Sequence, residues 1–340
     1  MTESLQQIAK AMVAPGKGIL AADESSGTIK KRFDAINTES TETSRRDYRE
    51  FMFRTDEAMK NYISGVILYD ETIRQTSADG NATPLVEIIK AAGSIPGIKV
   101  DAGAKPMAGF PGETITEGLD GLDERLAEYY KLGARFAKWR AVIDISPTIP
   151  TNACIEANTE ALARYAALCQ KNGIVPIVEP EVLMDGDHTA DRCMEVTEAT
   201  LRSLFNALAR HNVLLEGTIL KPNMVVSGKK CATQAGIAEV AEKTITVFKR
   251  TVPAAVPGIV FLSGGQSDEL ATAHLDAMNK LGNLPWALSF SYGRALQAAP
   301  QKAWGGKAEN VPAAQKAFAH RAKMNSLAAL GKWDAGMEKA

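Results

Sequence analysis

Short runs rich in apolar and β-branched residues recur eight times along this chain, and most are followed by a longer stretch with helical periodicity. The eight runs span residues 18–25, 63–69, 98–102, 135–142, 174–182, 215–225, 259–264 and 286–292. The helical pattern is clearest in residues 117–132, 159–172, 191–211, 234–251 and 267–281. Alternating strands and helices predict parallel strands joined by crossover helices, which is an α/β architecture. Eight such units predict a single closed (β/α)8 barrel, the TIM barrel.

The remaining segments fit around that barrel without a second domain. No low-complexity stretch or long linker divides the 340 residues, so we expect one catalytic barrel domain over residues 1–340. Residues 1–16 are predicted to form a helix that covers the barrel, because Leu5, Ile8 and Met12 fall on one helical face. Residues from Ala295 onward are expected to form helices that pack outside the last strand.

Composition narrows the function classes. Lys and Arg number 39 and Asp and Glu 40, for a formal net charge of −1, which argues against a nucleic-acid partner. No apolar stretch approaches the ~20 residues of a membrane span, and the first residues lack the pattern of a secretory signal. The 4 cysteines form no CxxC pair and the 4 histidines are scattered. We therefore expect reduced thiols in a cytoplasmic protein, with no metal site and no cofactor.

Three of the predicted strands carry charges where a covered parallel strand is normally apolar. Side chains alternate faces along a strand, so Lys138 and Arg140 share one face, and Glu179 and Glu181 share another. Lys221 lies near the end of the next run. A buried charge costs several kcal/mol unless it is paired.

These charges are expected to meet at the mouth of the barrel. Neighbouring strands lie about 4.8 Å apart, and barrel enzymes carry their chemistry at the carboxyl ends of the strands. A structural ion-pair network is the alternative interpretation. Asp23 and Asp101 also end apolar runs. Each aspartate alone is more typical of a helix cap or a loop charge than of a catalyst, but the strand that ends at Asp23 opens on to the same mouth.

Glycine-rich turns end the last two predicted strands. Glycines let backbone N–H groups approach an anion, serines add hydroxyls, and an arginine adds a fork of donors. The loops after the seventh and eighth strands are the usual phosphate site of this fold. Two ordinary turns are the alternative. The candidate phosphate ligands are Ser263, Gly264, Gly265, Ser291, Gly293 and Arg294.

A lysine inside an apolar barrel suits covalent chemistry. A free lysine amine is protonated at neutral pH and is not nucleophilic, but burial and the nearby cation Lys138 would both favour the neutral amine of Lys221. A neutral amine attacks a ketone and forms an iminium, which draws electrons from an adjacent C–C or C–H bond. Glu179 is placed to shuttle protons, and no metal is required.

The chain resembles the class I fructose-bisphosphate aldolase family over essentially its whole length. The matching blocks are residues 18–25, 136–140, 174–181, 213–223, 261–267 and 289–297. The resemblance implies reversible cleavage of fructose 1,6-bisphosphate to dihydroxyacetone phosphate and glyceraldehyde 3-phosphate, as in glycolysis and gluconeogenesis. It also implies a cytoplasmic homotetramer.

The resemblance further implies a role for each matching residue. Lys221 would form the Schiff base, Glu179 would be the general acid and base, and Asp23 would handle the C4 hydroxyl proton and hold the iminium. Lys138 would stabilise charge in the carbinolamine steps. The residues implied to position Lys138 and the substrate hydroxyls are Glu181 and Arg140.

Phosphate binding is implied at both ends of the substrate. The two glycine-rich turns correspond to the family's C1-phosphate site. The residues at family positions near the other phosphate are Ser25, Thr28 and Arg32. Many relatives carry a lysine after the aspartate at position 101, where this chain has Ala102. Lys105 is the candidate replacement, and the departure leaves the preference between bisphosphate and monophosphate open.

A second departure concerns proton exchange. Many relatives end in a flexible tail with a terminal tyrosine that assists this step, whereas the last tyrosine here is Tyr292.

Three rival functions remain compatible with the sequence. The same Schiff-base chemistry would serve fructose 1-phosphate or sedoheptulose 1,7-bisphosphate. A non-catalytic scaffold predicts damage to the charged set, which is intact, and a metal-dependent aldolase predicts clustered histidines.

Overall fold

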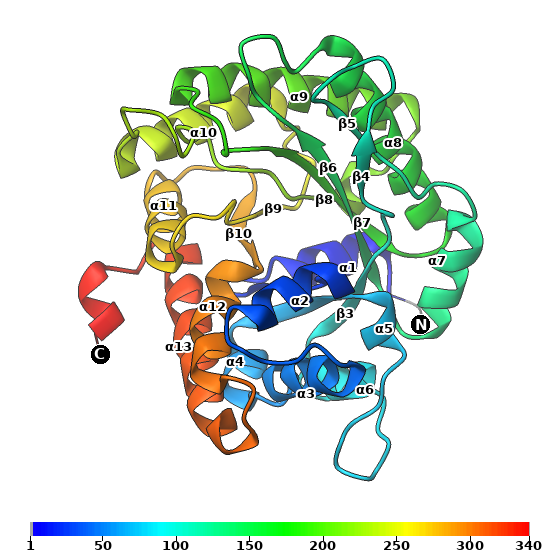
Figure 1. Cartoon of the computed structure of the whole chain (residues 1–340). Coiled ribbons are helices and arrows are strands. Elements are labelled where there is room, and N and C mark those ends of the chain that lie inside the picture. The colour runs from blue at the N-terminus through cyan, green and yellow to red at the C-terminus, as the bar shows by residue number, and fades with distance from the viewer. Residues whose placement is uncertain (1–2, 340) are drawn as a thin grey trace.

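A closed barrel of parallel strands forms the centre of the molecule (Figure 1). The computed structural model describes residues 3–339, and within them the strand order around the barrel is β1-β10-β9-β8-β7-β6-β3-β2. The barrel strands are β1 Gly18–Ala22, β2 Ile63–Leu68, β3 Ile95–Lys99, β6 Phe136–Ile143, β7 Val175–Val182, β8 Ile219–Leu220, β9 Gly258–Phe261 and β10 Ala287–Tyr292. The predicted (β/α)8 fold class is confirmed.

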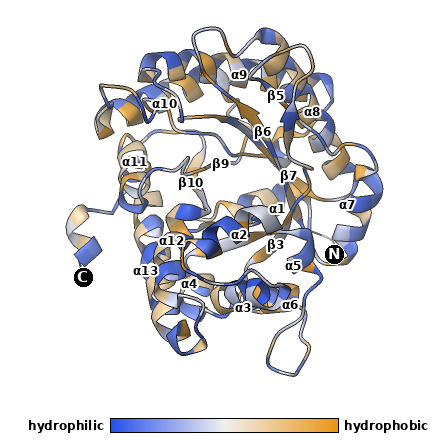
Figure 2. Cartoon of the chain, in the orientation of Figure 1, coloured by the Kyte–Doolittle hydropathy of each residue, from blue (hydrophilic) through white to orange (hydrophobic). Residues whose placement is uncertain are grey.

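Helices surround the barrel and connect its strands (Figure 1). From residue 122 onward these are α7 Leu122–Lys131, α8 Asn152–Lys171, α9 Ala190–Arg210, α10 Ile237–Thr251, α11 Asp268–Lys280, α12 Arg294–Trp304 and α13 Val311–Ala329. Hydroxyl side chains of Thr151, Thr189 and Ser267 cap the first turns of α8, α9 and α11, which satisfies backbone N–H groups that have no partner within the helix. The strands are predominantly hydrophobic and the helices are mixed, as a covered sheet requires (Figure 2).

Helix α1 (Leu5–Met12) covers the amino-terminal end of the barrel. Ser4 and Gln7 form a capping box at its start, and Ile8, Met12 and Val13 pack into the cluster that fills the barrel interior. The barrel residues of this cluster are Ile19, Ala21, Ile67, Phe136, Val175, Ile177, Ile219 and Val260. The predicted covering helix is present, but it ends at Met12 rather than at residue 16. Residues 1 and 2 of that prediction lie outside the described part.

Glycines make room for one large aromatic ring inside the barrel. Phe136 is fully buried, and a Cβ atom at Gly97 would lie 2.3 Å from its ring. At Gly65 the same atom would lie 2.9 Å from that ring. The two small residues on β2 and β3 therefore let Phe136 on β6 fill the space that three strands share.

Several predicted boundaries are wrong, and three of them show why. The third strand is Ile95–Lys99 rather than 98–102, because Pro96 and Gly97 weaken the local strand signal although they pair with β2. The sixth run, 215–225, begins as a 3-10 turn at Leu215–Gly217, and only Ile219–Leu220 pairs as a strand. Helix α8 begins at Asn152 rather than at 159, because Thr151 caps it.

The sequence patterns also missed the helices of the first third and one hairpin. These helices are α2 Ser26–Asp34, α3 Glu42–Phe53, α4 Asp56–Asn61, α5 Asp70–Ile73 and α6 Leu85–Ala91. The hairpin pairs β4 Ala104–Pro106 with β5 Thr114–Thr116 in antiparallel fashion, outside the barrel. After α12, short 3-10 turns cover Ala308–Asn310 and Ala335–Lys339.

Candidate active site

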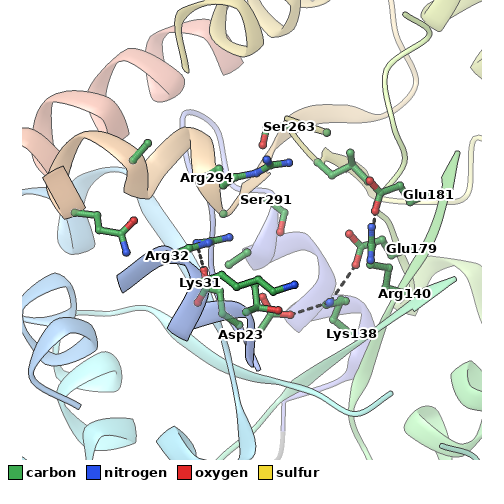
Figure 3. A pocket seen from close by; sticks show the side chains of 18 of the residues that line it. Asp23, Lys31, Arg32, Lys138, Arg140, Glu179, Glu181, Ser263, Ser291 and Arg294 are labelled. Carbon is green, nitrogen blue, oxygen red and sulfur yellow. Dashed lines mark hydrogen bonds and ion pairs between the residues drawn. The ribbon is translucent and has the colours of Figure 1, made fainter. Parts of the chain in front are cut away.

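A cavity of about 640 Å³ opens at the carboxyl ends of the barrel strands (Figure 3). This volume is within the usual range for sites that hold small molecules. Its charged and hydrogen-bonding lining residues are Asp23, Glu24, Thr28, Lys31, Arg32, Lys138, Arg140, Glu179, Glu181, Lys221, Ser263, Ser291, Arg294, Gln301 and Lys302. Side chains from strands on opposite sides of the barrel therefore face one space.

Four charged side chains, three of them buried and that of Asp23 13% exposed, meet at the base of this cavity. Lys138 Nζ lies 2.8 Å from Asp23 Oδ2 and 3.3 Å from Glu179 Oε2, and Lys221 Nζ lies 3.1 Å from Glu179 Oε1. Lys138 and Glu179 are on the paired strands β6 and β7, and the Lys221 backbone N–H donates to Val178 on β7. Strand pairing therefore fixes the spacing of the ammonium and carboxylate groups.

The cluster keeps opposite charges ionised. Burial alone would raise the pKa of Asp23, but the charges of Lys138 and Lys221 outweigh it and lower that pKa to about 2. Burial likewise opposes the charged form of Lys138, yet Asp23 and Glu179 hold its pKa above the usual lysine range. Asp23 is thus an anion and Lys138 a cation throughout the neutral pH range.

A second ion pair lies closer to the opening. Arg140 Nε donates to Glu181 Oε2, and this carboxylate raises the arginine pKa against the effect of burial. The Arg140 backbone N–H donates to Asp101 Oδ2 at 3.2 Å, and Lys99 Nζ lies 2.7 Å from Asp101 Oδ1. Asp101 therefore ties β3 to β6, which is a structural role.

The turns after β9 and within the β10–α12 connection form the opposite wall. Gly264 lines the cavity and Gly265 does not. Their φ values of +58° and +82° are a left-handed conformation that glycine adopts without strain. Ser263 lines the wall, and the buried Ser291 hydroxyl faces the cavity with no hydrogen-bond partner among residues 3–339. Arg294 begins α12, whose N-terminus favours an anion.

Helix α2 supplies the third side. Thr28 and Arg32 line the cavity, and Arg32 donates to Glu24. The Ser25 hydroxyl caps α2 by accepting from the Thr28 backbone N–H at 3.4 Å, and Ser25 is not among the lining residues. Lys31 on the same helix lines the cavity and was not singled out from the sequence.

Two further lysines differ from expectation. Lys105 lies on the exposed hairpin strand β4 and does not line the cavity. Lys99, at the end of β3, was overlooked, although its charge helps to lower the pKa of Asp23. Placing the third strand too late along the chain hid Lys99, since the residue then fell inside the run rather than at its carboxyl end.

Other kinds of site are not found in the described part of the chain. No group of three or more His, Cys, Asp or Glu side chains within residues 3–339 is arranged to hold a metal ion. No helix in that range is long and apolar enough to span a membrane.

Known proteins share both this sequence and this architecture. The sequence model of fructose-bisphosphate aldolase class I matches residues 4–340. A probable fructose-bisphosphate aldolase class 1 from Xanthomonas axonopodis pv. citri is 62% identical over 97% of this chain and 98% of its own. The fructose-bisphosphate aldolase of Dictyostelium discoideum is 54% identical over 97% and 93%. The chain belongs to the class I fructose-bisphosphate aldolase family.

The structural comparison agrees with this assignment. A solved fructose-bisphosphate aldolase from Plasmodium falciparum, in complex with TRAP and a small-molecule inhibitor, is 49% identical. It superposes with a TM-score of 0.95 over 98% of this chain and 95% of its own. The expected family, fold and enzyme class are confirmed: the chain is a class I fructose-bisphosphate aldolase, which is a carbon–carbon lyase.

Proposed function

We propose that this enzyme cleaves fructose 1,6-bisphosphate reversibly to dihydroxyacetone phosphate and glyceraldehyde 3-phosphate through a Schiff base on Lys221. One observation carries the proposal. The Lys221 amine is buried at the carboxyl end of β8 and lies 3.1 Å from Glu179, which also contacts Lys138. A nucleophile and a proton acceptor in hydrogen-bond reach are the geometry that covalent catalysis needs.

Schiff-base formation uses Lys221 and Glu179. Attack on the C2 ketone requires the uncharged amine, and Glu179 is placed to accept the proton that the ammonium group gives up. The amine nitrogen forms a bond to C2 as the C–O π bond breaks, and Glu179 returns its proton to the oxygen to give a carbinolamine. Glu179 then takes a second proton from the nitrogen and gives it to the hydroxyl, which leaves as water, so that the iminium remains. Lys138 stays cationic beside these oxygens and stabilises negative charge on them.

Bond cleavage follows from the positive charge on the iminium. Glu179, a carboxylate again after dehydration, takes the proton of the C4 hydroxyl and later gives it to the enamine carbon. The C4 oxygen becomes the aldehyde carbonyl, and the electron pair of the C3–C4 bond moves into the iminium to give an enamine. Asp23 lies opposite Lys138 in this cluster. Because its pKa is about 2, it acts as a fixed anion that accepts the C4 hydroxyl hydrogen bond and stabilises the iminium. Protonation of the enamine and hydrolysis release dihydroxyacetone phosphate.

Both phosphates have cationic partners in this arrangement. The glycine turn with Ser291, Gly293 and Arg294 would hold the C1 phosphate. Thr28 and Arg32, supported by Ser25 at the start of α2, would hold the other. Lys31 lines the cavity and takes the cationic role first expected of Lys105, which lies outside it. Two cations at this far end favour a bisphosphate over fructose 1-phosphate, and sedoheptulose 1,7-bisphosphate is the runner-up substrate.

Borohydride trapping tests the covalent step. We would incubate the enzyme with dihydroxyacetone phosphate and EDTA, reduce it, and map the modified peptide by mass spectrometry. A stable adduct on Lys221 is expected, and Lys221→Met should abolish it while leaving the circular dichroism unchanged. An adduct on Lys138, or trapping that persists in the variant, would move the nucleophile. Bound sugar phosphate without an adduct would favour a binding protein instead.

The family resemblance also supports a cytoplasmic homotetramer in which residues 1–340 form one catalytic domain. The formal net charge of −1 gives no general attraction to nucleic acids or anionic membranes. Light scattering coupled to gel filtration would test the assembly. A mass of four chains is expected, and a monomer at assay concentration would contradict this part of the proposal.

A further inference from the structure

A second cation lies beside the glycine turn of the C1-phosphate site, and the catalytic scheme above gives it no role. A Cβ atom at Gly265 would lie 2.7 Å from Arg294 Nη2 and 2.8 Å from Lys229 Nζ. The two cationic groups therefore approach the same side of one glycine. Their positions come from different parts of the chain, since Arg294 begins α12 and Lys229 is in the loop after β8.

Backbone hydrogen bonds hold Lys229 in this position. Its N–H donates to the Met184 carbonyl at 2.7 Å, and the Lys230 N–H donates to the Gly186 carbonyl at 2.9 Å. The loop after β8 is thereby attached to the loop after β7. The Lys229 ammonium group lies 2.6 Å from Asp185 Oδ1, and this side chain is 41% exposed.

The charges around Gly265 do not balance. Among the ion pairs of residues 3–339, Lys229 is paired with Asp185, whereas Arg294 has no carboxylate partner. Asp185 is itself 61% exposed, so water screens its hold on Lys229. Two adjacent cations with one screened carboxylate favour binding of a further anion. A phosphate monoester carries a charge of about −1.5 to −2 near neutral pH, which matches two cationic ligands better than one.

We propose that Lys229 is a second cationic ligand of the phosphate that binds at the Gly264–Gly265 turn. The inference deepens the proposed function, because that turn is the assigned C1-phosphate site. In the free enzyme Asp185 holds the ammonium group beside the turn, and the phosphate shares it when substrate binds. Lys229 then sets affinity for substrates phosphorylated at C1, in addition to Arg294.

Steady-state kinetics with two sugars tests the proposal. Lys229→Met should raise the KM of fructose 1,6-bisphosphate and of fructose 1-phosphate by the same factor, about tenfold, because both carry the C1 phosphate and lose one charge-assisted contact. The kcat should stay within about twofold, since the phosphate is held equally before and during bond cleavage. Lys229→Arg should restore most of the affinity.

The neighbouring Lys230 provides the matched control. It is exposed, and Lys230→Met removes the same charge without touching Gly265, so its KM values should equal those of the wild type. Equal KM values for Lys229→Met and Lys230→Met would overturn the proposal. An effect of Lys229→Met confined to fructose 1,6-bisphosphate would also overturn it, because Lys229 would then serve the other phosphate.

Calorimetric titration with inorganic phosphate separates this inference from the proposed reaction. The wild type should bind phosphate about tenfold more tightly than Lys229→Met, and as tightly as Lys230→Met. That result would support the inference about Lys229 even if the wild type cleaved neither sugar. Equal phosphate affinity in all three proteins would reject the inference even if the wild type is an active aldolase.

Discussion

At the scale of single residues, Lys138 neutralises two buried carboxylates at once, those of Asp23 and Glu179. Replacing it with methionine leaves both anions buried with Lys221 as their remaining close cation. Breaking a buried ion pair in this way costs about 3–5 kcal/mol. We expect Lys138→Met to lower the free energy of unfolding by that amount in urea titrations at pH 7.5. Lys30→Met, at a side chain that is 63% exposed, should change it little.

The same variant should reverse the pH dependence of this site. In the wild type the folded-state pKa of Asp23, about 2, lies below its unfolded value of about 3.9. The contribution of Asp23 to the free energy of unfolding is therefore present above pH 4 and is lost as the pH falls toward 2. Without Lys138, burial would raise the folded-state pKa, so Lys138→Met should regain stability as the pH falls from 7 toward 4. If Lys138→Met lowers the free energy of unfolding by the same amount at pH 7.5 and at pH 4.5, relative to the wild type, this explanation is wrong.

Glu179 is expected to act on turnover rather than on binding. Glu179→Gln keeps the size of the side chain but removes the proton acceptor beside Lys221. Proton transfer by a positioned group contributes about 10²–10⁴-fold to rate, so kcat should fall within that range while KM changes little. Glu195→Gln, at an exposed carboxylate on α9, is the control and should keep wild-type kinetics. A raised KM with unchanged kcat would exclude Glu179 from proton transfer.

The charged strand positions of this site were readable from the sequence, and the helix positions were not. Lys138, Glu179 and Lys221 were visible because a charge interrupts a strand that is otherwise apolar. Lys31 and Glu24 have no such contrast, since a charged residue on or before a helix is usually solvated. Their place at the cavity depends on how α2 crosses the barrel mouth, which short-range periodicity does not encode.

At the scale of elements, the alternation of strands and helices in the sequence was enough to predict the barrel. It was not enough to predict the short or irregular strands and helices. Strands β6 and β7 are eight residues each and show a clear pattern. Strand β8 has two paired residues, so the run 215–225 reflected burial rather than pairing. Helices α2, α4, α5 and α6 have only four to nine residues, and the stability of helices this short comes from packing against the barrel more than from local propensity.

A buried histidine of α11 supports the Ser263–Gln266 turn after β9 through a hydrogen bond to Gln266. His274 Nδ1 lies 2.5 Å from Gln266 Oε1, and Gln266 Nε2 donates to the Ser263 carbonyl at 3.0 Å. Because the Gln266 oxygen accepts, His274 carries its proton on Nδ1, and its Nε2 has no partner among the described residues. Burial lowers the pKa of His274 to about 4. Protonation would therefore place an unpaired charge in the support of the turn.

This histidine should make the fold sensitive to mild acid. The unfolded-state pKa of about 6.5 exceeds the folded value, so the unfolded chain takes up the proton first. The contribution of His274 is complete above about pH 6.5 and is lost as the pH falls to about 4, by roughly 3 kcal/mol. His274→Gln has no such titration, so its urea unfolding curves at pH 7 and pH 5 should differ less than those of the wild type. Parallel behaviour of the two proteins would assign the acid sensitivity elsewhere.

At the scale of the whole molecule, the residues that stabilise the barrel and the residues of the candidate active site lie at opposite ends of it. The carboxyl ends of the strands hold the charged cavity, whereas the amino-terminal end is closed by α1 and an apolar cluster. A sequence pattern that predicts the barrel also predicts this division, because parallel strands bring all their carboxyl ends to one side. Substitutions at the two ends should therefore have different consequences.

Met12→Ala tests that division. Met12 is fully buried in α1 where it packs into the barrel interior, and truncating a buried methionine costs about 2–5 kcal/mol. We expect a lower free energy of unfolding with kcat/KM unchanged at 25 °C, since the folded fraction stays near one and the cavity is at the other end. Lys10→Ala, at an exposed position of the same helix, should change neither quantity. A fall in kcat/KM of the folded Met12 variant would show that packing at the closed end sets the spacing of Lys138, Glu179 and Lys221 at the open one.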